Sequence, residues 1–230
     1  MKDIGYIILE KMNVYRQKYL EHPNSLSNPD YFKELAEQFE FIQPNNYKGI
    51  GRTVLESTPF YPDNNGNIEI TEQDINLGFD NLKARREIAK IRFADKEFED
   101  FENEFYFKNY ADVENVFRLL ENSNDYEILK FTLDSNPAQL TLGFDIGWLN
   151  GYSIICDTCI TPMWHPPDFE DMSDILIRLK LLNEYCLFND YETAKDYLEC
   201  YNSKSWGEKD GFKIYQILEI LPAANRVDCR

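Results

Sequence analysis

Apolar residues occupy every second position from residue 140 to residue 148. This period of two predicts a strand with one buried face. An Asn-Gly pair at 150–151 has the composition of a hairpin turn, and a second apolar run follows it. We therefore expect an antiparallel hairpin over residues 140–156 in the middle of the sheet. Asp145 falls on the polar phase of its first strand, which predicts an exposed side chain.

Two other stretches have the composition of strands. Residues 127–133 are rich in apolar side chains and end at an Asp-Ser-Asn-Pro turn. Residues 211–220 have the same character and end before a Leu-Pro pair. We expect a strand at each place, and a short strand at 68–70.

Most of the remaining chain has apolar residues at the three- and four-residue spacing that is typical of amphipathic helices. The expected helices cover roughly the first 20 residues, 28–43, 72–93, 112–121, a segment that starts between 168 and 174, and 190–201. Thr71 and Asp74 have the spacing of a capping box in front of the third helix. Gly78 weakens the interior of that helix.

Helices dominate the chain before residue 125, and strands begin after it. We therefore expect an α+β fold, in which a helix-rich N-terminal half packs on an antiparallel, hairpin-containing sheet with C-terminal helices. The two parts are 1–125, mainly helical, and 126–230, α+β, with a linker near 122–126. They form either two units or one continuous domain. Residues 44–67 are rich in glycine, proline and asparagine but lack the spacing of a phosphate-binding loop.

The chain of 230 residues has 24 basic and 41 acidic residues, a net charge of −17. This charge disfavours nucleic acid and acidic membrane surfaces as partners, and it favours a basic protein partner. The sequence has neither a run of about 20 apolar residues nor a signal-peptide pattern. Its five cysteines, an odd number, argue against a disulfide framework. We expect a cytoplasmic protein.

The strongest charge bias lies at 94–107, where acids surround three phenylalanines that share one helix face. One interpretation is a solvated face over a packed phenylalanine stripe. The other is an acidic, aromatic platform for a basic partner, and a homodimer through the aromatic surface is compatible with the same pattern. The candidate partner-binding residues are Asp95, Glu97, Glu99, Asp100, Glu102 and Glu104.

A second candidate site follows the expected hairpin. Cys156, Cys159 and His165, with Asp157 beside them, are the residue types of a thiol- or zinc-dependent hydrolase. The alternative is structural, because the prolines after His165 fix a rigid corner and the sequence after Cys159 is not a helix start. We expect no catalytic residue, metal or cofactor, and the hydrolase stays the alternative.

Four segments carry a resemblance to a known class of proteins. In chain order they are LGFDIGW, GYSIICD, PMWHPP and LLNEYCLF, within about 130–221. This order of strands, turns and aromatic anchors resembles small bacterial proteins that act as immunity proteins of polymorphic toxin systems. The resemblance implies a protein that binds and blocks a cognate toxin domain and has no catalytic activity. It assigns no site residue.

Overall fold

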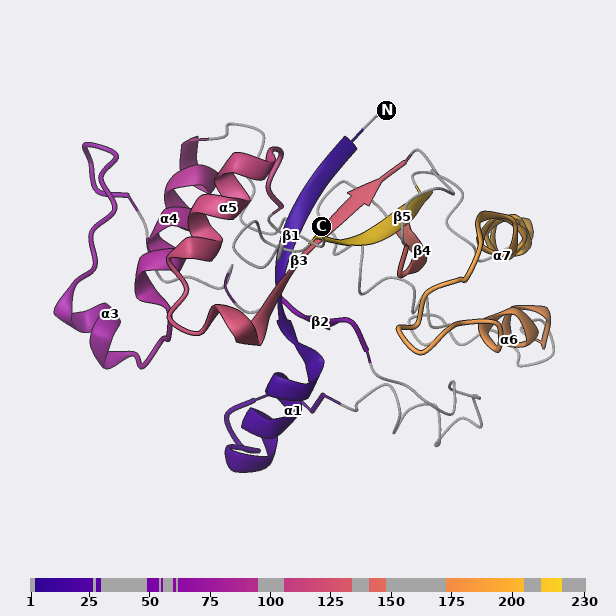
Figure 1. Cartoon of the computed structure of the whole chain (residues 1–230), viewed down its shortest axis with the longest axis horizontal. Coiled ribbons are helices and arrows are strands. Elements are labelled where there is room, and N and C mark those ends of the chain that lie inside the picture. The colour runs from indigo at the N-terminus through magenta and orange to yellow at the C-terminus, as the bar shows by residue number, and fades with distance from the viewer. Residues whose placement is uncertain are drawn as a thin grey trace, which may run out of the picture.

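The computed structural model describes residues 3–26, 28–29, 49–53, 55, 60, 62–94, 106–133, 141–147, 173–204 and 212–220. Within these residues, five strands form one sheet in the order β2-β1-β3-β5-β4, and all neighbouring strands are antiparallel (Figure 1). The strands are β1 (Asp3–Lys11), β2 (Gly51–Arg52), β3 (Tyr126–Thr132), β4 (Gly143–Gly147) and β5 (Lys213–Ile220).

Helices and the sheet together give an α+β fold, so the expected fold class is confirmed. The helices are α1 (Met12–Glu21), α3 (Glu72–Asn76), α4 (Leu82–Ala94), α5 (Tyr110–Arg118), α6 (Ser173–Leu179) and α7 (Tyr191–Ser203), with a 3₁₀ turn, η2, at Ser123–Asp125. Four elements confirm their sequence predictions with small shifts in their ends: α5, β3, α7 and β5.

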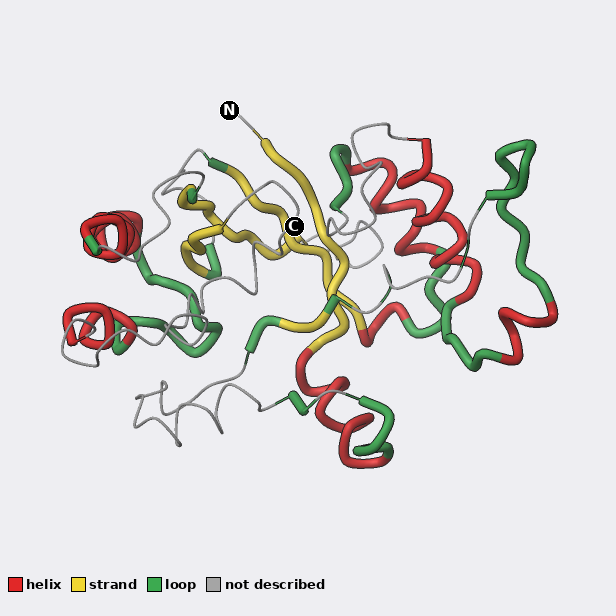
Figure 2. Tube along the Cα trace, turned by 180° about the vertical axis from the view of Figure 1, so that it is seen from behind, coloured by secondary structure: helices red, strands yellow, loops and turns green. Residues whose placement is uncertain are grey.

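One face of the sheet is covered by helices at both ends (Figures 1 and 2). Ile8 and Ile128 pack against α4 and α5 in one apolar cluster, and Ile146 and Ile214 pack against α6 and α7 in another. The strand register pairs Ile8 with Ile128 and Ile146 with Ile214, so each pair points to the same side. Burying this face supplies most of the driving force that docks the helices.

The opposite face of the sheet is apolar as well. Leu9, Leu129 and Ile217 lie in a separate buried cluster on that side. Asp145 faces the same way because it pairs with buried Tyr215 across β4 and β5, and its exposed fraction is 0%. The expectation of an exposed Asp145 is therefore wrong, since both faces of β4 are covered. One Asp145 oxygen accepts a hydrogen bond from the Ile146 main-chain nitrogen at 2.7 Å.

The first segment of the chain corrects a prediction. Residues 3–11 form a strand where helical spacing predicted a helix, and only α1 is helical. The reason lies at 7–9, where three consecutive apolar residues are buried in clusters on both sides of the sheet. An unbroken apolar run of this kind is typical of a strand with two covered faces.

The expected helix at 72–93 is two helices. The chain turns between α3 and α4, where Gly78 and Asn81 have φ angles of +73° and +51°. The capping box of Thr71 and Asp74 is confirmed at the start of α3. Residues 68–70 form no strand, because Ile68 packs beside α4 instead of pairing with the sheet.

The first strand of the expected hairpin is β4, and the rest of the hairpin lies outside the described residues. Among the described strands β4 stands at the end of the order and not in the middle, because β5 pairs with both β3 and β4. The helix expected after 168–174 ends at Leu179, well before Cys186. Residues 28–43 are described only at 28–29.

Single-residue bridges pair with β1 and with β4, the last strand of the order. Tyr6 of β1 exchanges two main-chain hydrogen bonds of 2.8 Å with Phe107, beside the two-residue strand β2. Phe144 of β4 exchanges two main-chain hydrogen bonds, of 2.8 and 2.9 Å, with Phe188. Strands from 1–125 and from 126–230 share the sheet through the pairing of β1 with β3.

Gly143 packs closely against the segment that forms the second bridge. A Cβ atom there would lie 2.6 Å from the Leu187 Cβ and 2.8 Å from the Phe188 carbonyl oxygen, at a φ of +151°. We expect Gly143→Ala to lower the free energy of unfolding by about 3 kcal/mol, because overlap adds to backbone strain. Gly66→Ala, with φ +80° and no atom within 4 Å, costs only about 1 kcal/mol. Urea denaturation followed by circular dichroism measures both, and equal losses would contradict the packing argument.

Candidate functional site

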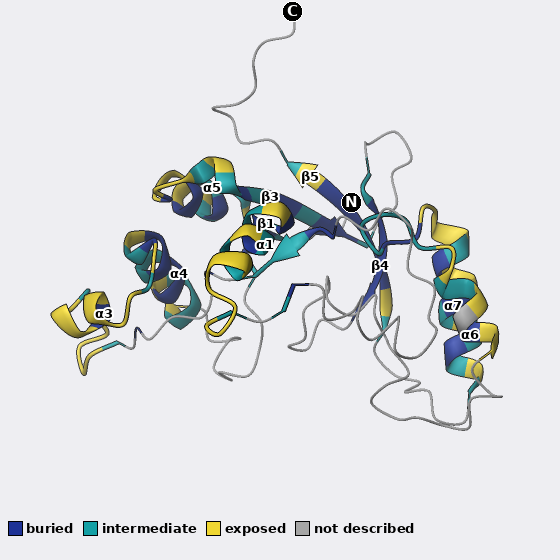
Figure 3. Ribbon diagram, turned by 90° about the horizontal axis from the view of Figure 1, so that it is seen from below, coloured by how far each residue is buried: buried dark blue, intermediate teal, exposed yellow. Residues whose placement is uncertain are grey.

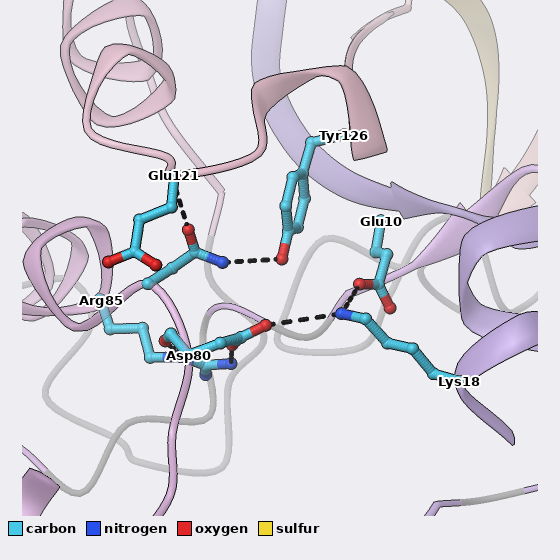
Figure 4. Close-up of polar contacts among 7 residues, drawn as sticks. Glu10, Lys18, Asp80, Arg85, Glu121 and Tyr126 are labelled. Carbon is cyan, nitrogen blue, oxygen red and sulfur yellow. Dashed lines mark hydrogen bonds and ion pairs between the residues drawn. The ribbon is translucent and has the colours of Figure 1, made fainter. Parts of the chain in front are cut away.

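Seven polar residues connect the end of β1, α1, the turn before α4, and β3 (Figure 4). We call this set the polar network, and its members are Glu10, Lys18, Asp80, Asn81, Arg85, Glu121 and Tyr126. It is the site where the described residues concentrate buried polar groups from separate elements. Its side-chain partners lie between 5 and 62 positions apart in the chain.

A buried carboxylate stands at one end of the polar network. Glu10 points from β1 toward the same side as Ile8, and its side chain is 2% exposed. Lys18 of α1 donates a hydrogen bond to it and also lies 3.5 Å from an Asp80 carboxylate oxygen. The ammonium group therefore bridges two carboxylates and compensates the burial of the first.

An arginine stands at the other end. Arg85, in the first turn of α4, is 6% exposed and donates to both the main-chain and the side-chain oxygen of Asp80, each at 2.7 Å. The Phe79 ring lies 5.1 Å from its guanidinium carbon. Two hydrogen bonds and a ring contact hold this guanidinium in one orientation. Asp80 thus links the cations of α1 and α4.

Asn81 joins this charged chain to the sheet. Its amide nitrogen donates to the Tyr126 hydroxyl at 2.9 Å, and its amide oxygen accepts from the Glu121 main-chain nitrogen at 2.9 Å. Its own carbonyl accepts from the Arg85 main chain at 3.0 Å. The residue has φ +51° and is 5% exposed, a conformation that asparagine adopts more readily than most residues. One side chain therefore fixes the turn, α5 and β3 together.

Three groups of the polar network, Asp80, Lys18 and Tyr126, are held in their ordinary form. Burial disfavours the Asp80 carboxylate, but the hydrogen bond and charge of Arg85 outweigh it and lower the pKa. Burial opposes the Lys18 ammonium, yet Glu10 and Asp80 raise its pKa. Burial, with the nearby acids, raises the pKa of Tyr126. Near neutral pH the Lys18 amine, the Tyr126 phenol and the Asp80 carboxylate are not poised for proton transfer.

Two carboxyl groups have raised pKa values. Burial raises the pKa of Glu10 despite the opposing effect of Lys18. Burial and the neighbouring charge of Glu219 raise the pKa of Glu127 to about 7, while Lys11 opposes the shift. A carboxyl with a pKa near 7 is a candidate general acid or base. The described residues place no cluster of three or more His, Cys, Asp or Glu that holds a metal around it or elsewhere.

The candidate residues chosen from sequence lie outside the described part of the chain. This holds for the acidic set Asp95, Glu97, Glu99, Asp100, Glu102 and Glu104, and for Cys156, Asp157, Cys159 and His165. The structure therefore does not test either set. The polar network was missed because its members are distant in sequence. The one local signal was Glu10, an acid at the end of an apolar run.

Comparison with known proteins finds no match for this chain among protein-family models, curated proteins or solved structures. Among the helices that the structure describes, none has both the length and the apolar character to cross a bilayer. The polar network is therefore interpreted from its own geometry. Its hydrogen bonds and ion pairs hold the helices against the sheet.

Lys18→Met removes the cation from a buried carboxylate. We expect the free energy of unfolding at pH 7 to fall by about 3 kcal/mol. Glu10→Gln combined with Lys18→Met restores all but about 1 kcal/mol, because no buried charge then remains unpaired. Without Lys18 the pKa of Glu10 rises further above its unfolded value. The destabilisation of the single variant therefore increases as pH rises above about 4.5. Denaturation at pH 4 and pH 7 measures the free energy of unfolding of both variants. A loss in Lys18→Met that is the same at both pH values would contradict the prediction, and so would equal losses in the single and the double variant.

Glu127→Gln removes the carboxyl whose pKa is about 7. Because this pKa is raised above its unfolded value, folding favours the protonated form, and stability is lost as pH rises from about 4.5 to 7. We expect the variant to be no more stable than the wild type at pH 4 and more stable by about 1–2 kcal/mol at pH 8, allowing for partial exposure. Glu69→Gln, at an exposed position, serves as control. A gain that does not change with pH would contradict this assignment.

Proposed function

We propose that this protein is a non-enzymatic acidic binding protein that neutralises a basic protein domain, as bacterial immunity proteins do. The observation that carries the proposal is the excess of 41 acidic over 24 basic residues. In the polar network, buried Glu10 and Arg85 are paired with oppositely charged groups. These two pairs cancel, so the other residues of the chain carry the whole net charge of −17.

An acidic surface acts on a basic partner in two ways. It accelerates encounter by long-range attraction, and it places carboxylates over the cationic groups that the partner uses for its own substrate. A toxin that acts on nucleic acid has such a cationic cleft. The same field repels nucleic acid and a second copy of this chain, which favours a different protein as the partner.

The polar network also favours binding over catalysis. Its lysine, tyrosine and aspartate are held in their ordinary charge states, and each hydrogen bond connects structural elements. A rigid body of this kind loses little conformational entropy when it binds. The acidic set at 95–104 stays a prediction for the contact surface, and the hydrolase centred on Cys156, Cys159 and His165 stays the alternative.

The genes on either side and the binding of the toxin domain that we expect one of them to encode test this proposal, and the absence of such a gene would contradict it. We expect titration calorimetry to show a one-to-one complex whose Kd weakens at least tenfold between 50 and 300 mM NaCl. The combined substitutions Glu97→Gln, Glu99→Gln and Glu102→Gln weaken it at least tenfold. A control with Asp174→Asn, Glu192→Gln and Glu199→Gln removes the same charge at exposed sites on α6 and α7 and weakens it less.

Three further results would contradict the proposal. The wild type fails to bind the neighbouring toxin domain, or it binds without inhibiting it. Alternatively, the purified protein hydrolyses a substrate in a manner that depends on Cys156 or His165.

A further inference from the structure

Residues 62–81 form an arm that extends along α4 and away from the sheet (Figures 1 and 2). The arm contains α3 and ends at Asp80 and Asn81 of the polar network. Figure 3 shows α3 at the outer edge of the molecule with mostly exposed residues. The arm therefore presents a side that faces away from the rest of the described chain.

The arm is held firmly at several points. Ile68 is 5% exposed and packs with Ala89 of α4. One Asp63 oxygen accepts hydrogen bonds from the main-chain nitrogens of Asn65 and Asn67, each at 2.8 Å. The capping box fixes the start of α3, and the polar network fixes the end of the arm. A segment held this way is preorganised for binding.

Two large aliphatic side chains on the arm are not buried. Ile75 is 58% exposed and Leu77 is 55% exposed, at the end of α3 and just after it. Ile68 on the same arm is buried against α4, so the arm already has a separate inward-facing contact. Ile75 and Leu77 therefore lie outside that contact, as two exposed apolar side chains two positions apart in the chain. Covering such side chains releases water and stabilises a complex.

The charged residues of the arm itself have one sign, whereas α4 beside it carries basic residues such as Lys83 and Lys90. Residues 62–81 contain five acids, Asp63, Glu69, Glu72, Asp74 and Asp80, and no Lys, Arg or His. Asp74 and Asp80 are engaged within the fold, and Glu69 and Glu72 are exposed. A cationic partner gains from both acids, whereas nucleic acid or a second copy of this acidic arm is repelled.

A similar apolar pair elsewhere has different surroundings. Ile177 is 58% exposed and Leu181 is 51% exposed, on and after α6. Arg178 and Lys180 lie next to them in the sequence. The two pairs match in exposure and differ in the charge of their immediate sequence neighbours, so Ile177 and Leu181 serve as the matched control.

We infer that the arm is a docking surface for a cationic amphipathic segment of a protein partner. Apolar side chains of that segment cover Ile75 and Leu77, and its Lys or Arg residues pair with Glu69 and Glu72. This inference rests on the proposed function, because it takes the partner to be basic. It adds a second contact to the one expected at 95–104.

Fluorescence anisotropy with two labelled peptides tests the arm. The probes are an amphipathic peptide of lysine and leucine and a matched peptide of glutamate and leucine. We expect the cationic probe to bind the full-length protein in low salt and the acidic probe to bind at least tenfold more weakly. Ile75→Ser with Leu77→Ser weakens the cationic probe at least tenfold. Ile177→Ser with Leu181→Ser, the matched control, changes it less than twofold.

The charges of the arm are tested separately. Glu69→Gln with Glu72→Gln keeps the apolar pair and reduces the salt dependence of binding the cationic probe. Circular dichroism and urea midpoints establish that every variant is folded. Four results overturn the inference: no binding of the cationic probe, equal binding of both probes, equal losses in the two serine variants, or a homodimer that Ile75→Ser with Leu77→Ser dissociates.

The toxin domain separates this inference from the proposed function. If the domain binds the wild type but is unaffected by Ile75→Ser with Leu77→Ser, the docking role of the arm is contradicted and the proposed function stands. If the cationic probe binds at the arm and the toxin domain does not bind, the proposed function is contradicted and the arm remains a site for basic segments.

Discussion

The burial of the Glu10 carboxylate is the constraint on which the N-terminal part of the structure depends. A charge at the covered end of β1 is unfavourable unless a cation lies beside it, and Lys18 supplies that cation from α1, the helix that directly follows the strand. Lys18 also reaches Asp80, and Asp80 holds Arg85 at the start of α4. The position of one carboxylate is thus linked to the positions of two helices. Such a chain of contacts favours a single arrangement over several compact alternatives.

Elements with a strong local pattern could be predicted from the sequence. α5 and α7 each have an apolar stripe and a side-chain cap at their first turn, so local chemistry determines their type and limits. β3 and β5 have long runs of strand-forming residues. β1 was predicted as a helix because its apolar residues continue into α1 at helical spacing, and its burial on both sides depends on β3 and on helices far along the chain. The break between α3 and α4 requires two positive φ angles, of which only Gly78 gave a signal.

The candidate site shows the same division. The capping box of Thr71 and Asp74 is local and was recognised, whereas the polar network joins residues from distant segments and was not. Charge composition favours a basic partner but has no bearing on where one would bind. The arm proposed as a docking surface combines exposed apolar residues with acids and is fixed to the body of the protein. Only the folded structure brings out that combination.

The bridges on β1 and β4 limit how an extended chain could pair with the sheet. Tyr6 is bonded to Phe107 on the side of β1 away from β3, and Phe144 is bonded to Phe188 on the outer side of β4. Each bridge occupies main-chain groups that an incoming extended peptide would otherwise pair with. At these residues the edge-to-edge stacking that begins fibril growth is hindered. A chain that approached either strand there would meet side chains instead of free main-chain groups, and substituting those side chains would alter the fit without disturbing the backbone of the sheet.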